Sequence, residues 1–129
     1  QITDKKVYYV DGSVNVDIRE EFKSRMEKND DVIIVASYGT FSTGISIKNI
    51  HNIFFTESFK SEVIIRQSIG RGLRKHESKD IVKIYDFIDD FRYKAEDHDW
   101  VNYVYRHGIA RRTIYKEEKF PFEVQNIRF

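Results

Sequence analysis

The sequence has 129 residues, of which 40% are hydrophobic and 15% aromatic, so it can form a compact domain with a hydrophobic core. This composition excludes a disordered chain, and the absence of cysteine excludes disulfides and thiolate chemistry. No apolar run approaches the ~20 residues that span a bilayer, so we expect no membrane contact, and the net charge of only +1 means that polyanions are bound only locally. The absence of cysteine favours a cytoplasmic setting, and we expect a monomer.

The predicted elements alternate between strands and helices. In chain order, the sequence predicts a strand at 7–10, a turn at 11–13, a helix at 14–27, a strand at 32–36, a polar loop at 37–46, a strand at 52–56, a helix at 61–69, a strand at 81–87 and a helix at 100–118. Ile18, Phe22 and Met26 recur at spacing four and form one apolar helix face. The run VIIVA at 32–36 is typical of a parallel strand that is buried on both faces.

This alternation favours an α/β fold with a mostly parallel sheet flanked by helices. We expect residues 1–90 to form this core, with its beginning cut short because the chain starts at Gln1 and enters a strand almost at once. Residues 91–129 are expected to add a C-terminal helix and an extended tail packed on the same domain. Pro121 in that tail argues against a central strand.

Two glycine patterns resemble nucleotide loops, and both fail. Residues 39–46, GTFSTGIS, nearly match a phosphate loop, but Ile45 replaces the lysine that carries the positive charge to the phosphates. Gly70 and Gly72 would need a third glycine where Lys75 stands to form a dinucleotide fingerprint. Neither pattern therefore indicates a complete nucleotide site in this chain.

Gln67, Arg71 and Arg74 are separated by four and three positions, which places them on one helix face. Two guanidinium groups and an amide form a set of donors suited to phosphate oxygens. Gly70 and Gly72 between them allow close approach of backbone or ligand. The alternative is an arginine cluster that is solvated or paired with nearby carboxylates.

The pattern Gln67-x-x-Gly70-Arg71-x-x-Arg74 resembles motif VI of the superfamily 2 helicases, whose arginines reach across an interdomain cleft to ATP. The segment at 32–37, followed by TGISI at 43–47, resembles motif V, and the stretch from YVDGS at 9–13 through Arg19 resembles the segment that precedes it. Together these motifs span residues 7–75 in the order of the family. Two positions depart from its pattern, because Ser68 stands where arginine is usual and Ser46 where an acidic residue is usual.

More narrowly, the segments IGRGLR at 69–74, YDFID at 85–89 and ARRTIY at 110–115 are similar to phage recombination and repair helicases of this superfamily. The resemblance implies the second RecA-like motor domain of an ATP-dependent helicase. Such a helicase acts on branched recombination and replication intermediates, made of DNA or of RNA–DNA hybrids.

The resemblance also implies roles for single residues. Catalytic roles fall to Arg71, Arg74 and Gln67, nucleotide contacts to Gly44, Ser46 and Gly70, and nucleic-acid contacts to Ser37, Thr43 and Gly12. The arginines would stabilise charge on the transferred γ-phosphoryl group. The phosphate-loop lysine and the Mg²⁺ ligands would lie in a preceding RecA-like domain of the same protein, so this chain alone is expected to be inactive.

Two other classes stay open, namely a non-enzymatic nucleic-acid-binding domain with a motor-like fold and a restriction-enzyme translocase domain. No metal site is expected, since the four histidines lack ligand spacing and Asp86, Asp89 and Asp90 fit a solvated or capping turn better than a metal cluster. A final group of basic residues either adds a nucleic-acid surface or pairs with the acidic stretch before it, and its members are Arg106, Arg111 and Arg112.

Overall fold

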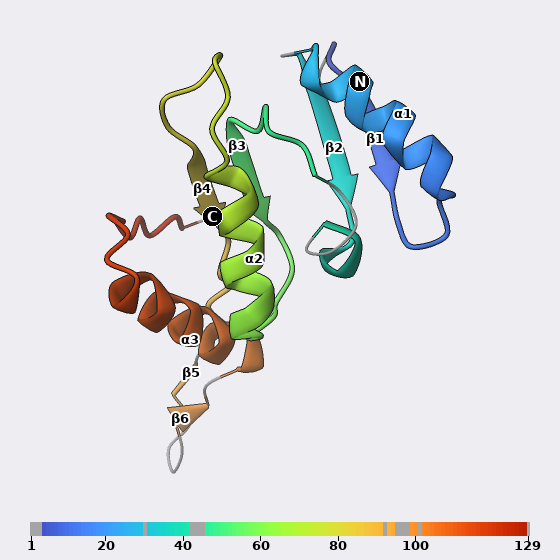
Figure 1. Cartoon of the computed structure of the whole chain (residues 1–129). Helices are drawn as coiled ribbons and strands as arrows, with labels where there is room; N and C mark the ends of the chain where they lie inside the picture. The colour runs from blue at the N-terminus through green and yellow to red at the C-terminus, as the bar shows by residue number, and fades with distance from the viewer. Residues whose placement is uncertain are drawn as a thin grey trace. The chain divides into compact units, whose positions relative to one another are not determined.

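The computed structural model describes residues 4–29, 31–41, 46–91, 93–94, 99–100 and 102–128 (Figure 1). The elements are β1 (Lys6–Val10), α1 (Val16–Glu27), β2 (Val32–Ala36), β3 (Asn52–Phe55), α2 (Glu62–Gly72), β4 (Lys83–Asp86), β5 (Tyr93–Lys94), β6 (Asp99–Trp100) and α3 (Tyr103–Glu117). They form two compact units, the first made of Gln1–Phe54 and Val63–Tyr85 and the second of Phe55–Glu62 and Asp86–Phe129. None of the helices within the described ranges is long and apolar enough to cross a membrane.

In the first unit, β1 and β2 pair in parallel, with Tyr8 opposite Ile34 and the ends of both strands in register. Helix α1 begins at residue 16 instead of the predicted 14, because the Asn15 side chain accepts a hydrogen bond from the Asp17 backbone and so caps the helix. Met26 of α1 is 2% exposed and belongs to the core beneath this strand pair. The predicted strand–helix–strand order is confirmed here.

The second strand differs from its prediction in one respect. Exposure alternates along β2, with Ile33 37% and Val35 47% exposed, so the strand is half-buried on one face and exposed on the other. Val7 and Tyr9 of β1 are exposed in the same way. The expectation that residues 32–36 are buried on both faces is therefore wrong for this chain, since a β-branched run indicates a strand but not what covers each face.

Strands β3 and β4 form a second two-stranded sheet. The Lys83 N–H donates to the His51 carbonyl at 2.9 Å and the Phe87 N–H donates to the Phe55 carbonyl at 3.0 Å, a constant offset that makes the pair parallel. Helix α2 runs three residues beyond its predicted end, and Gly72 at that end lies against the side chain of Ile53 in β3. Parallel strands followed by a closely packed helix agree with the predicted α/β class.

In the second unit, helix α3 begins after Asn102, whose side chain accepts a hydrogen bond from the Tyr105 N–H at 2.6 Å. Trp100 was predicted in this helix but lies in β6, which pairs with β5 in antiparallel orientation. The N-cap sets the helix start and separates it from Trp100. Two-residue strands carry too little periodicity for a sequence pattern to predict them. After α3 the chain is extended, and Phe122 contacts the ring of Tyr115.

Candidate functional site

The predicted site residues of helix α2 and its core residues lie on different faces of the helix. Gln67, Gly70 and Arg71 are exposed or half-buried, and Arg74 is exposed just beyond the helix end. The buried face of α2 consists of Ile65, Ser68, Ile69 and Gly72. Gln67 and Arg71 therefore share one face of α2, because the helical period places residues four apart side by side. The predicted common helix face does not extend to Arg74, since α2 ends at Gly72 and Arg74 lies in the turn after it.

The structure brings Arg74 into contact with Ser46, 28 positions earlier in the chain. The Arg74 guanidinium donates a hydrogen bond from Nη1 to Ser46 Oγ. Ser46 is held in place by the next residue, Ile47, which is 3% exposed in the core of the first unit. Two residues that the motif resemblance singled out separately are thus in contact. The two other predicted residues of this loop, Thr43 and Gly44, lie outside the described residues.

The two arginines form a local positive centre. Partial burial, and then the charge of Arg74, lower the pKa of Arg71 from its ordinary value. An arginine stays charged despite such a shift, so the two like charges favour an anionic ligand nearby. The pair lies at the C-terminal end of α2, where the helix dipole favours cations over anions. An anion bound here would therefore be recognised by the guanidinium groups and not by helix amides.

The two glycines of α2 have different surroundings. A Cβ atom at Gly72 would lie 2.7 Å from Cδ1 of Ile53 and 3.2 Å from Cγ2 of Val82, so this glycine allows the helix to pack closely on the strand. A Cβ atom at Gly70 would meet nothing within 4 Å. Close approach of backbone explains Gly72, whereas Gly70 borders open space next to Arg71. Only the tertiary structure distinguishes these roles.

The structure also accounts for Ser68, the position where the superfamily usually has arginine. Its side chain is fully buried, and its Oγ has no hydrogen-bond partner among the described residues. An arginine at this place would have to bury its guanidinium group against the core, which is costly without a partner. The site in this chain is therefore built from Arg71 and Arg74 without a third arginine at position 68.

Gly12 and Ser37 follow strands β1 and β2, which end in register, so both predicted nucleic-acid contacts lie at one edge of this strand pair. The Ser37 hydroxyl donates to Thr40 Oγ1 at 2.9 Å and accepts from the Thr40 N–H at 3.4 Å. The Gly12 carbonyl accepts a hydrogen bond from Arg19 Nη2 at 3.0 Å. These contacts shape the two loops, and a role in nucleic-acid binding stays a prediction for both residues.

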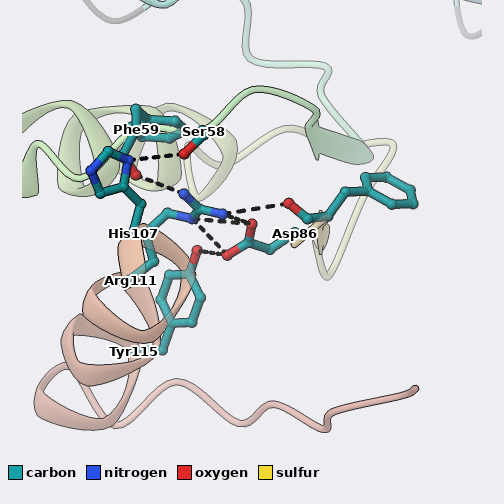
Figure 2. Close-up of polar contacts among 7 residues, drawn as sticks. Ser58, Phe59, Asp86, His107, Arg111 and Tyr115 are labelled. Atoms are coloured by element: carbon teal, nitrogen blue, oxygen red, sulfur yellow. Dashed lines mark hydrogen bonds and ion pairs between the residues drawn. The ribbon is translucent and has the colours of Figure 1, made fainter. Parts of the chain in front are cut away.

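A separate polar cluster in the second unit answers the question left open for Arg111 (Figure 2). The Arg111 side chain is completely buried, donates to both carboxylate oxygens of Asp86, and donates from Nη1 to the Phe59 carbonyl at 2.6 Å. The Tyr115 hydroxyl donates to the same carboxylate at 2.8 Å, and Ser58 Oγ lies 2.9 Å from His107 Nδ1. Arg111 thus pairs with the acidic stretch and is not available to nucleic acid.

Asp86 is consequently occupied by Arg111 and Tyr115, which explains this carboxylate without a metal ion. Within the described ranges, no group of three or more His, Cys, Asp or Glu side chains is placed to hold a metal. Sequence reasoning missed Tyr115 and Ser58 as partners in this cluster. The spacing of four between Arg111 and Tyr115 could have indicated that both lie on one face of a helix.

Comparisons with known proteins agree with the motif resemblance. No protein-family model matches the chain. The ATP-dependent DNA helicase uvsW of Enterobacteria phage T4 is 42% identical in an alignment 128 residues long, which covers 95% of this chain and 26% of that protein. The putative ATP-dependent helicase IRC3 of Saccharomyces cerevisiae is 41% identical over 61 residues, or 47% of this chain and 9% of that protein. The chain spans about a quarter of the length of the phage relative.

Two solved structures match the fold. The crystal structure of T4 UvsW has a TM-score of 0.66 at 44% identity and covers 91% of this chain and 25% of that chain. The C-terminal part of the Fun30 ATPase domain has a TM-score of 0.58 at 20% identity, with 88% of this chain and 41% of that chain covered, and shows the fold alone. These likenesses confirm the predicted resemblance to superfamily 2 helicases and the RecA-like α/β motor fold.

Proposed function

We propose that this chain is the C-terminal motor segment of an ATP-dependent superfamily 2 helicase and supplies Arg71 and Arg74 as arginine fingers to an ATP site shared between two motor domains. The observation that carries the proposal is the contact between Arg74 and Ser46, which brings a residue of the motif VI segment together with a residue of the motif V segment. The names of the phage and yeast relatives, both ATP-dependent helicases, support ATP as the ligand.

In this site, the guanidinium groups of Arg71 and Arg74 stabilise the negative charge that develops on the γ-phosphoryl group during transfer. Arginine fingers in this position are worth about 10³ to 10⁵ in rate. Partial burial of Arg71 strengthens its interaction with an anion, because less water screens the charge. Gln67 is exposed on the same face and positions the phosphoryl group, while the open space at Gly70 admits the nucleotide.

The residues of this chain fit only the phosphate end of an ATP complex. Ile45 stands where a phosphate-loop lysine is required, so the lysine and the acidic ligands of Mg²⁺ come from a preceding RecA-like domain of the same protein. ATP bound with Mg²⁺ between the domains draws them together, and hydrolysis releases them. We therefore expect the isolated chain to have no nucleic-acid-stimulated ATPase activity.

The substrate we propose is DNA, or an RNA–DNA hybrid, at branched recombination and replication intermediates. The relative from phage T4 carries the name of a DNA helicase, which supports DNA as the polymer. Ser37, Thr43 and Gly12 would bind its phosphate backbone without reading bases, so binding should be largely independent of sequence. The protein would act as a monomer in the cytoplasm, that of the host cell if a phage encodes it.

The test is to measure DNA-stimulated ATPase activity of the complete protein with Arg71→Ala. Because an arginine finger acts on the transition state, we expect kcat to fall at least about 10³-fold while the Kd for ATP changes little. Arg25→Ala, which removes an exposed arginine from α1, is the matched control and should keep full activity. Near-normal turnover of Arg71→Ala would refute the finger assignment, whereas a complete protein without any ATPase activity would favour a nucleic-acid-binding domain instead.

A further inference from the structure

The loop that follows α2 is fastened to the segment that follows Ser46. The ammonium group of Lys79 donates one hydrogen bond to the carbonyl of Gly72 at 2.6 Å and another to the carbonyl of Ile50 at 2.9 Å. Gly72 is the last residue of α2, and Ile50 lies four residues after Ser46. One side chain therefore bridges the backbones of the two segments that carry the arginines and Ser46.

The bridge lies where the physical chemistry favours a lysine. The last carbonyl groups of a helix have no partner within the helix, and the negative end of the helix dipole attracts a cation. Lys79 donates to the Gly72 carbonyl in this way. Gly72 lies between Arg71 and Arg74 in the chain. Partial burial lowers the pKa of Lys79, which indicates that water is partly excluded around its ammonium group.

Side chains around Lys79 hold the same loop in place. Ser78 Oγ donates to Asn49 Oδ1 at 2.7 Å, and His51 Nε2 lies 2.8 Å from that oxygen. His76 Nδ1 lies 2.8 Å from Ser78 Oγ. Ser78 and Lys79 thus attach the loop to the 49–50 segment, and Lys79 also binds the end of α2.

The hydrogen bond between Arg74 and Ser46 requires both segments to keep their relative position. A long arginine side chain loses rotamer freedom when it is held there, so a small displacement of its backbone would release it. We infer that Lys79 is a positioning residue that holds the end of α2 against the 46–50 segment and so fixes Arg71 and Arg74 for the ATP site. This inference rests on the proposed function.

The test uses the complete protein with Lys79→Met, which keeps the aliphatic stem and removes the ammonium group. Misplacement of catalytic groups by about 1 Å costs on the order of 10²-fold in rate, so we expect kcat for DNA-stimulated ATP hydrolysis to fall by that order. The KM for ATP should stay within about twofold, since the fingers act in the transition state. Lys79→Arg, which retains two donors, should recover most of the rate.

Lys83→Met is the matched control, because Lys83 is exposed on β4 in the same unit and should leave kcat unchanged. Thermal unfolding of each variant shows whether the protein is folded at the assay temperature. If Lys79→Met does not fold, Lys79→Gln replaces it, since its shorter amide can donate to one carbonyl but no longer bridges the two. A folded Lys79→Met or Lys79→Gln protein with unchanged kcat would overturn the inference.

A double variant separates positioning from general loss of stability. Arg71→Lys keeps a charge and should retain residual turnover, against which Lys79→Met can be measured again. If Lys79 acts through Arg71 and Arg74, the second change should lower kcat by clearly less than about 10²-fold in this background, because only Arg74 is then left to be misplaced. A full additional 10²-fold loss there would overturn the inference. By contrast, normal turnover of Arg71→Ala would refute the proposed function, whatever Lys79→Met does.

Discussion

Arg111 and Asp86 form a buried ion pair, with Arg111 Nη2 2.7 Å from Asp86 Oδ1 and Arg111 Nε 2.9 Å from Asp86 Oδ2. The arginine side chain is 0% exposed and the aspartate side chain 12% exposed. The guanidinium group also lies 5.1 Å from the centre of the Phe59 ring. The pair therefore joins α3 to the end of β4 and to the 55–62 segment within one unit.

Removing one partner of this pair should destabilise the protein strongly. In Arg111→Met the Asp86 carboxylate stays largely buried without its cation, and we expect the free energy of unfolding to fall by roughly 3–5 kcal/mol. Urea denaturation of the chain measures this change. Arg106→Met, on the exposed side of α3, is the control and should alter stability by less than about 0.5 kcal/mol. If both substitutions lowered the free energy of unfolding equally, the buried Arg111–Asp86 pair would not be the source of the stability.

Replacing both partners should cost less than replacing one. Asp86→Leu combined with Arg111→Met leaves no unpaired charge, so the double variant should regain much of the stability lost in either single variant. The same denaturation experiment compares the three proteins. A double variant less stable than both single variants would show that the pair itself is not the source of the effect.

Tyr115 should make the stability fall at high pH. Burial, and then the neighbouring Asp86 carboxylate, raise the pKa of Tyr115 above its ordinary value of 10.0. The folded protein therefore holds this proton more tightly than the unfolded chain, and the contribution is complete below about pH 10 and is lost as the pH rises towards the folded pKa. Tyr115→Phe should weaken the decline in urea midpoint between about pH 8 and pH 11.

Tyr103 offers the matched control for this pH experiment, because its side chain is 76% exposed. Tyr103→Phe should keep the same dependence of the urea midpoint on pH as the unchanged protein. Identical pH profiles for Tyr115→Phe and the unchanged protein would count against a buried, protonated Tyr115.

Two helix glycines should respond oppositely to alanine. A Cβ atom at Gly108 would lie 2.5 Å from Cδ1 and from Cγ2 of Ile88, so we expect Gly108→Ala to lower the free energy of unfolding by roughly 1–3 kcal/mol. Gly70→Ala meets nothing within 4 Å and should raise it by up to about 1 kcal/mol through helix propensity. Thermal unfolding compares the two variants.

Each glycine also has its own check. Ile88→Ala should restore stability to the Gly108→Ala protein if the clash with Ile88 is the cause. Gly70→Ala in the complete protein should lower DNA-stimulated ATPase activity even though the variant is more stable, if the nucleotide approaches this residue as proposed. Unchanged activity would remove Gly70 from the nucleotide site and leave the stability prediction intact.

Lys119 occupies a backbone conformation that glycine favours. Its φ of 57° lies in the left-handed region, where the Phe120 N–H donates to the Tyr115 carbonyl at 2.9 Å and closes the end of α3. Lys119→Gly removes the clash of Cβ with the backbone, so we expect stability to rise by about 1 kcal/mol. Lys116→Gly, inside the helix, should lower it by about the same amount. A destabilised Lys119→Gly protein would contradict this conformation.

The sequence by itself determined the elements whose signals are local. The β-branched run at 32–36 matches β2 at both ends, and the spacing of Gln67 and Arg71 placed them on one side of α2. Residues a few positions apart share a strand or helix whatever surrounds it, so such patterns can be read without the fold. The motif order likewise indicated the RecA-like class that the structural likenesses confirm.

Only the tertiary structure decided which distant residues meet. It shows that Arg74 contacts Ser46 and that Lys79 bridges Gly72 and Ile50. It also shows that Arg111 forms an ion pair with Asp86 and does not contribute to a nucleic-acid surface. It also showed that one face of β2 is exposed. Burial and long-range pairing depend on how separate elements pack, and a pattern that repeats every two or four residues carries no information about that packing.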